Sequence, residues 1–261
     1  MSIKEKLANG EAVTIAFFGD SVTQGCFEGD YDPADNLFTY RSRFCEMLRE
    51  KYPAAKIDMI NAGIAGNVSG QGLYRMQGDV LDHKPNLCVV CFGINDSSCY
   101  AITPLTKALG LAKGFLDSMK PNTDAKAYEL LESCKPLDAY RYAMTRILDS
   151  LQEKHIPVIL LTPNRMSLKG AKDRKNPAWL LSHINARIVK KGQMDKIIRT
   201  ARELAQERNI PVADGYARWI ELEKQGVVTP ETYVNGTNHP TRELHAELAS
   251  VLMKTFESAA L

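Results

Sequence analysis

Long hydrophobic runs are missing from this sequence of 261 residues: no segment offers the roughly 18 uninterrupted apolar residues that a membrane-spanning helix requires. Residues 1–10 carry lysines and a glutamate but no apolar core, so we expect no signal peptide. Together these absences lead us to expect a cytoplasmic protein.

An excess of charge of either sign is also missing. The 33 lysine and arginine residues face 31 aspartate and glutamate residues, which gives a formal net charge of +2. This balance produces no field strong enough to favour nucleic acid or an anionic membrane surface as a partner. We therefore expect a small-molecule partner, while the oligomeric state stays open.

The cysteines give no sign of a disulfide framework, because a chain without an export signal stays in a reducing compartment. The six residues are Cys26, Cys45, Cys88, Cys91, Cys99 and Cys134. We expect free thiols. Cys88 and Cys91 lie three apart in an apolar segment, so in a strand they point to opposite faces and cannot easily share a metal ion. The histidines show no ligand spacing either, and we expect neither a metal nor an organic cofactor.

Five apolar or β-branched segments alternate with amphipathic segments along the chain. We expect strands over residues 13–18, 56–60, 86–92, 157–162 and 210–214. We expect helices over residues 38–51, 70–82, 137–154, 193–208 and 241–259. Because β-helix-β crossovers are right-handed, this order predicts an α/β fold: a doubly wound, flavodoxin-like, three-layer sandwich with a five-stranded parallel sheet.

The length suits one large domain, and we expect residues 1–261 to form it. Residues 97–135 fit the alternation poorly, since they contain helical pieces separated by glycine and proline, and we interpret them as a helical insertion over the site. Residues 163–192 are expected to form a polar, basic loop region that contains Trp179 and His183.

Polar residues follow three of the expected strands. The turn after the first strand contains Ser21, the glycine-rich loop after the second contains Gly66, and the turn after the third contains Asn95. Since the carboxyl ends of parallel strands share one edge of a sheet, these residues should meet there. His239, in the loop before the last helix, can return to the same edge. Acyl transfer needs this set: a nucleophile, a base, and donors for the oxyanion.

At these positions the chain resembles the SGNH (GDSL) hydrolases. The matching blocks, in order, are Gly19-Asp20-Ser21, Gly63-Ile64-Ala65-Gly66-Asn67, Gly93-Ile94-Asn95-Asp96 and His239-Pro240. The resemblance implies that Ser21 is the nucleophile, that His239 is the general base, and that the Ser21 amide, the Gly66 amide and the Asn95 side chain form the oxyanion hole. It also implies a serine esterase for a small or carbohydrate-linked ester, with acetyl as the expected acyl group.

One departure from the family pattern concerns the third member of the triad. The family usually has an aspartate three residues before the histidine, and here that position is Gly236. We expect the His239 ring to be oriented by a carbonyl oxygen of the turn over residues 235–238 or by the Asn235 side-chain oxygen, with Asp214 as the alternative. A neutral acceptor should leave the pKa of His239 near or below about 6.5.

Other functions use the same residues differently. The site could hydrolyse thioesters or lysophospholipids, or pass the acyl group to an acceptor other than water. The chain could also be a non-catalytic, flavodoxin-like binding module, although it lacks a Gly-x-Gly-x-x-Gly motif and a P-loop lysine after the first strand. A hydrolase that has lost activity with its aspartate is the third alternative. Structural interpretations of three residues also stay open: Asn95 as a turn residue, Gly66 as a helix-start glycine and His239 as a helix cap.

Overall fold

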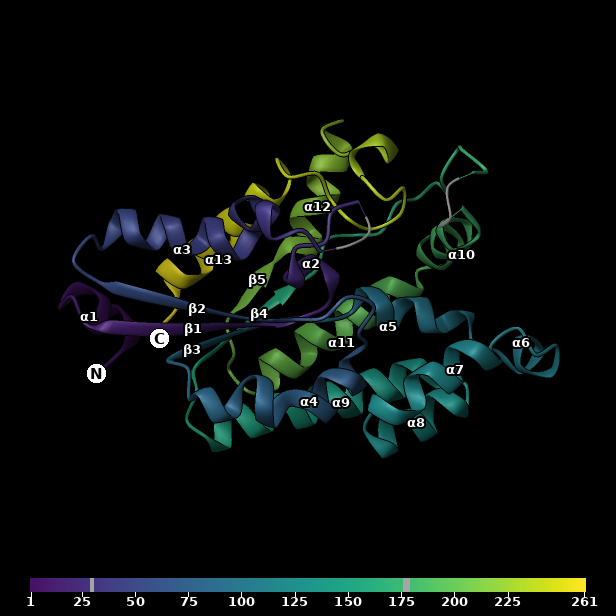
Figure 1. Ribbon diagram of the computed structural model, residues 1–261, viewed down its shortest axis with the longest axis horizontal. Coiled ribbons are helices and arrows are strands. Elements are labelled where there is room, and N and C mark those ends of the chain that lie inside the picture. The colour runs from purple at the N-terminus through teal and green to yellow at the C-terminus, as the bar shows by residue number, and fades with distance from the viewer. Residues whose placement is uncertain (29–30, 176–178) are drawn as a thin grey trace.

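The computed structural model describes residues 1–28, 31–175 and 179–261. At its centre lies a five-stranded, fully parallel sheet in the order β2-β1-β3-β4-β5 (Figure 1). The strands are β1 (Ala12–Gly19), β2 (Lys56–Gly63), β3 (Leu87–Cys91), β4 (Val158–Thr162) and β5 (Val212–Asp214). The chain leaves β1 toward one edge and, from β3 onward, builds toward the other, so the switch point lies between the ends of β1 and β3. Ligands of open α/β sheets bind at such a point.

Helices cover both faces of the sheet, which confirms the predicted three-layer sandwich (Figure 1). One face carries α3 (Tyr40–Lys51), α12 (Gly215–Lys224) and α13 (His245–Ser258), and the other carries α4 (Ser69–Asp79), α9 (Pro136–Glu153) and α11 (Gln193–Glu207). Alternate strand residues therefore enter two separate cores. Phe17 and Cys91 belong to the first core, whereas Phe18 and Cys88 belong to the second. Cys45, Cys88, Cys91, Cys99 and Cys134 are free thiols, as expected.

The remaining helices are short, apart from α10. They are α1 (Ile3–Ala8), α2 (Ser21–Gln24), α5 (Ile94–Ser98), α6 (Pro104–Ala108), α7 (Lys113–Met119), α8 (Ala125–Glu132) and α10 (Trp179–Lys190). The 3-10 turns are η1 (Pro33–Phe38), η2 (Leu81–His83), η3 (Cys99–Ala101), η4 (Lys120–Asn122) and η5 (Pro230–Thr232). Among the described residues, no helix is both long and apolar enough to cross a membrane.

The prediction of a loop over residues 163–192 is wrong for its second half, which forms α10. Its buried stripe consists of Ser182, Asn185, Ala186, Ile188 and Val189. Because two members of the stripe are polar, its helical spacing did not stand out as an apolar pattern. The short helix α1 and the helix α12 were not predicted either.

The segment 97–135 consists of helical pieces that contribute most of a third apolar cluster. This cluster contains Val68, Ile102, Leu116, Met119 and Leu131. Figure 1 shows α6, α7 and α8 extending beyond the sheet at the end where α5 follows β3. The segment therefore lies toward the edge at which the polar residues gather.

Candidate active site

The turn after β1 places Ser21 at the start of a short helix. A Cβ atom at Gly19 would lie 2.2 Å from Thr23 Oγ1 and 2.5 Å from the Cys91 carbonyl oxygen, so only glycine allows this close approach. Asp20 then caps α2, since its Oδ1 accepts a hydrogen bond from the Val22 amide at 3.0 Å. These contacts hold Ser21 at the switch point of the sheet.

Ser21 and His239 lie in hydrogen-bond contact although 218 residues separate them in the sequence. His239 Nε2 is 2.9 Å from Ser21 Oγ, and His239 Nδ1 is 2.9 Å from the Phe27 carbonyl oxygen. A carbonyl oxygen can only accept, so Nδ1 carries the hydrogen and the lone pair of Nε2 faces the serine hydroxyl. This tautomer, with the hydrogen on Nδ1, is the one that a base needs in order to take the serine proton. Ser21 and His239 expose only 4% and 6% of their surface.

The acceptor of the His239 ring is not the one predicted. Asn235 Oδ1 accepts from the backbone amides of Thr237 (3.1 Å), Asn238 (3.0 Å) and His239 (3.0 Å). It shapes the turn and fixes the backbone of His239, while the ring turns away toward Phe27. The predicted acceptor within the turn is therefore wrong, although the prediction of a carbonyl oxygen is right in kind.

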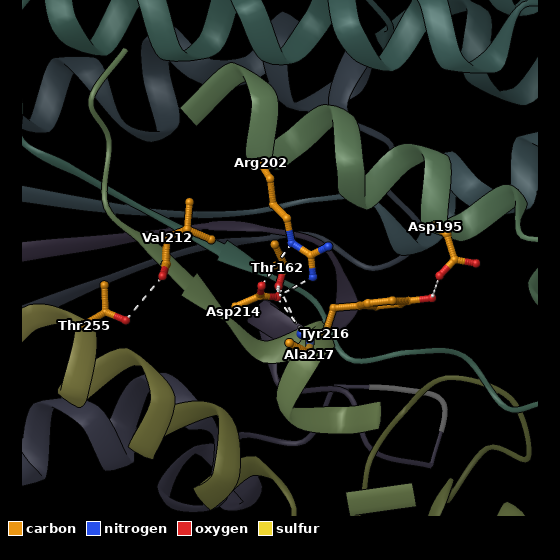
Figure 2. A network of polar contacts seen from close by, with 8 residues as sticks. All are labelled: Thr162, Asp195, Arg202, Val212, Asp214, Tyr216, Ala217 and Thr255. Carbon is orange, nitrogen blue, oxygen red and sulfur yellow. Dashed lines mark hydrogen bonds and ion pairs between the residues drawn. The ribbon is translucent and has the colours of Figure 1, made fainter. Parts of the chain in front are cut away.

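The alternative prediction, that Asp214 accepts from the His239 ring, is also wrong, because other groups donate hydrogen bonds to the Asp214 carboxylate (Figure 2). Arg202 donates to both of its oxygens at 2.9 and 3.0 Å, and Thr162 Oγ1 and the Ala217 amide donate to Oδ1 at 2.8 and 3.1 Å. Burial raises the pKa of Asp214, but the bonds from Arg202 and Thr162 bring it below its ordinary value. Asp214 joins β5 to α11 and caps α12.

Asn95 and the Gly66 loop, the other predicted donors, lie against each other. Asn95 Nδ2 donates to the Asn67 carbonyl oxygen at 3.0 Å, which leaves its second amide hydrogen for another acceptor. Gly66 is exposed and has a left-handed φ of +76°, and no atom of the residues that the structure describes lies within 4 Å of where its Cβ would be. A substrate could therefore approach its backbone closely.

Arg75 is a site residue that the sequence analysis missed. Its Nε donates to Asn67 Oδ1 at 2.8 Å, and its two terminal nitrogens donate to the carbonyl oxygens of Ala62 (2.8 Å) and Gly19 (2.9 Å). One guanidinium thus ties the Gly66 loop to the ends of β1 and β2. Its fourth partner is Asp79 Oδ2, at 2.6 Å. Two of the four partners are backbone oxygens, which leave no signature in a sequence.

Burial dominates the electrostatics of the site. It raises the pKa of Asp20 to about 7, with a further contribution from the charge of Asp96. Burial also raises the pKa of Asp96 to about 6, although Ser69 donates two hydrogen bonds to it. The pKa of His239 is lowered mainly by burial, against the effect of the Phe27 carbonyl. The expected direction for His239 is confirmed, but its main cause is burial.

Within the described ranges, no group of three or more histidine, cysteine, aspartate and glutamate side chains is arranged to hold a metal ion.

Known proteins resemble this chain in sequence and in fold. The family model described as "GDSL-like Lipase/Acylhydrolase family" matches residues 17–247. Axe2, an acetylxylan esterase from Geobacillus stearothermophilus, superimposes with a TM-score of 0.63 at 21% identity, over 95% of each chain. CEX, a two-domain esterase active on acetylated mannans, has a TM-score of 0.61 at 19% identity, over 98% of this chain and 51% of that one.

A curated relative, the uncharacterized lipoprotein YqeF of Bacillus subtilis (strain 168), is 32% identical over 84 residues. The match spans only 32% of this chain and 32% of that protein. At the identities of Axe2 and CEX, the superpositions establish a shared fold.

Proposed function

Because the chain belongs to the GDSL-like lipase/acylhydrolase family, we propose that it is a serine esterase that forms an acyl-enzyme on Ser21. The observation that carries the proposal is the 2.9 Å contact between Ser21 Oγ and a His239 ring whose tautomer is fixed by the Phe27 carbonyl. We further propose that the substrate is an acetyl ester of a small or carbohydrate alcohol. The names of Axe2 and CEX, which act on acetylated xylan and mannan, support this choice.

In the first half of the reaction, Ser21 Oγ attacks the ester carbonyl carbon while His239 Nε2 takes the hydroxyl proton. The tetrahedral intermediate then collapses: the bond to the alcohol oxygen breaks, and His239 returns its proton to that oxygen. The products of this half are the free alcohol and an acyl group on Ser21.

In the second half, His239 takes a proton from water, and the resulting hydroxide attacks the acyl carbon. Collapse of this intermediate releases the carboxylic acid and returns the proton to Ser21 Oγ. Both halves use the same base, so the lowered pKa of His239 keeps the free enzyme ready at neutral pH.

We propose the Ser21 amide, the Gly66 amide and the Asn95 side chain as donors to the oxyanion of both intermediates. The support is local geometry. First-turn amides of a helix lack partners within that helix, and Gly66 presents an open backbone. The Asn95 amide has a second hydrogen besides the one that bonds to Asn67. The contact from Arg75 to Asn67 would keep this loop in place before substrate binds.

Labelling with a fluorophosphonate, followed by mapping of the modified residue, tests the nucleophile. We expect modification of Ser21 in the wild type and none in Ser21→Ala, which should also lose about three to six decades of ester turnover while it stays folded. Modification of another serine would overturn the assignment.

A substrate panel tests the acyl group and the alcohol. Short-chain and long-chain nitrophenyl esters, acetylated xylo- and manno-oligosaccharides and a thioester should be compared with Ser21→Ala as the blank. We expect the highest kcat/KM for acetyl esters. A preference of tenfold or more for long acyl chains or thioesters would contradict the acetyl proposal while leaving the serine mechanism in place.

We also propose that the chain forms one hydrolase domain, in which residues 97–135 are a helical insertion. The third apolar cluster, to which this segment contributes most residues, supports the second part. A cytoplasmic location stays a prediction from the sequence.

A further inference from the structure

The carbonyl oxygen of Phe27 accepts from the His239 ring, and two residues that follow His239 in the sequence contact the ring of Phe27. The guanidinium carbon of Arg242 lies 4.6 Å from the centre of the Phe27 ring, and the His245 ring lies 4.8 Å from it. His239, Arg242 and His245 follow one another at intervals of three residues. One short stretch of chain therefore carries the base and also contacts the residue that orients it.

Arg242 is anchored by two carboxylates. Its guanidinium donates to both oxygens of Asp35 at 2.7 and 2.6 Å and to both oxygens of Glu28 at 2.9 and 3.1 Å. The Asp35 side chain is only 14% exposed, whereas that of Glu28 is 65% exposed. Two bidentate pairs fix the plane of a guanidinium in a way that a single surface ion pair does not.

We propose that Arg242 is a positioning residue of the esterase: it fixes the Phe27–Glu28 backbone so that the Phe27 carbonyl holds the His239 ring in place of the family's aspartate. This inference rests on the proposed function. A backbone carbonyl has no side chain of its own to set its direction, so its aim depends on what holds the neighbouring atoms. Here Arg242 contacts the ring of Phe27 and the side chain of the next residue.

His245 forms the second support of Phe27 without adding charge. It is fully buried, and its Nδ1 accepts from the Tyr40 amide at 3.1 Å. Burial lowers the pKa of His245 to about 3, helped by the charges of His239, Arg43, Arg41 and Arg242. At neutral pH it is therefore an uncharged ring that packs against Phe27.

The same ion pairs tune the charge around the base. Glu28 is the carboxylate that raises the pKa of His239, against the larger lowering by burial. Arg242 neutralises Glu28 and lowers the pKa of that carboxyl. Loss of Arg242 would leave the Glu28 charge uncompensated near the ring, whereas loss of the Glu28 charge would have the opposite effect.

The first test compares Arg242→Ala with Arg218→Ala. Arg218 is a matched control, because it also pairs with two carboxylates, Glu247 and Glu221, and is similarly exposed, but it lies on α12 without contact to Phe27 or His239. We expect kcat of Arg242→Ala to fall about 10- to 100-fold with KM within about twofold, as for a misplaced catalytic group. Arg242→Lys should recover part of the loss, and Arg218→Ala should keep the wild-type kcat.

The second test measures the titration of the His239 ring by NMR, which does not depend on turnover. We expect the midpoint to rise in Arg242→Ala and to fall in Glu28→Gln, relative to wild type. A purely structural role of Arg242 would reduce the folded fraction without moving either midpoint. If Arg242→Ala does not fold, Arg242→Lys and Glu28→Gln give the same comparison with smaller changes.

The outcomes separate this inference from the proposed function. A wild-type protein with no esterase activity would overturn the proposed function, whereas the NMR titration would still test the link between Arg242 and His239. An active wild type whose folded Arg242 variants keep both kcat and the His239 midpoint would overturn the positioning role alone.

Discussion

Replacement of Asp20 by asparagine should change how the free energy of unfolding depends on pH. Asp20 is fully buried beside the nucleophile, and its Oδ2 has no hydrogen-bond partner among the described residues. Asparagine can keep the cap of α2, because its own Oδ1 can accept from the Val22 amide. The variant therefore removes the ionisable group while it preserves the local structure.

Burial sets the size of the effect. A rise of the carboxyl pKa from 3.8 to about 7 corresponds to about 4 kcal/mol, at about 1.4 kcal/mol for each tenfold change in the ionisation constant. The folded protein holds this proton up to about pH 7, whereas the unfolded chain releases it near pH 4. The protonated Asp20 carboxyl therefore stabilises the folded state fully below pH 4, and this stabilisation is lost as pH rises toward 7.

Urea denaturation from pH 4.5 to pH 8 measures this contribution. We expect Asp20→Asn to be destabilised at low pH, where its unpaired amide costs about 1–3 kcal/mol. Relative to wild type, the variant should then gain up to about 4 kcal/mol as pH rises. Asp32→Asn is the control, since Asp32 caps η1 through a similar bond but is exposed. Parallel curves for Asp20→Asn and wild type, within about 0.5 kcal/mol, would refute the reasoning.

Three further predictions concern activity. Asn95→Ala should lower kcat about 10²- to 10³-fold with little change in KM, because an oxyanion donor acts in the transition state; a rise in KM alone would make Asn95 a substrate-binding residue. Asp214→Asn should keep kcat within about threefold and lower the free energy of unfolding by about 1–2 kcal/mol through its weakened bonds to Arg202, whereas a loss of about 10⁴ in kcat would restore Asp214 as the triad acid. The pH profile of kcat/KM should fall on the acid side with a midpoint below about 6.5, since burial lowers the pKa of His239, and a midpoint above about 7 would contradict a buried, neutral base.

The sheet and its reactive edge could be predicted because both depend on local patterns. A strand buried on two faces, such as β1, needs a continuous apolar run, and a parallel sheet brings the ends of its strands to one edge. Ser21 and Asn95 follow the neighbouring strands β1 and β3, so their convergence follows from the strand order. The prediction required no side-chain geometry.

The acceptor of the His239 ring could not be predicted, because it depends on no local pattern in the sequence. Phe27 contributes a backbone oxygen, which any residue type carries, and it lies 212 residues from His239 in the sequence. The helix α10 was not predicted for a related reason: its buried residues Ser182 and Asn185 are polar and make hydrogen bonds. Features that depend on backbone atoms or on paired polar groups become visible only in the folded chain.

Gly236 and the Phe27 carbonyl are best understood together. Gly236 has a left-handed φ of +74°, which lets the turn curl so that Asn235 collects three backbone amides, including that of His239. An aspartate at this position would cost about 1–2 kcal/mol in backbone strain. The turn therefore has a tightly bonded backbone and no carboxylate at this position. The His239 ring donates instead to the Phe27 carbonyl oxygen, in the segment that Arg242 contacts. On this view the missing aspartate reflects a different construction of the base, because the hydrogen bond that sets the tautomer is kept and only its negative charge is absent.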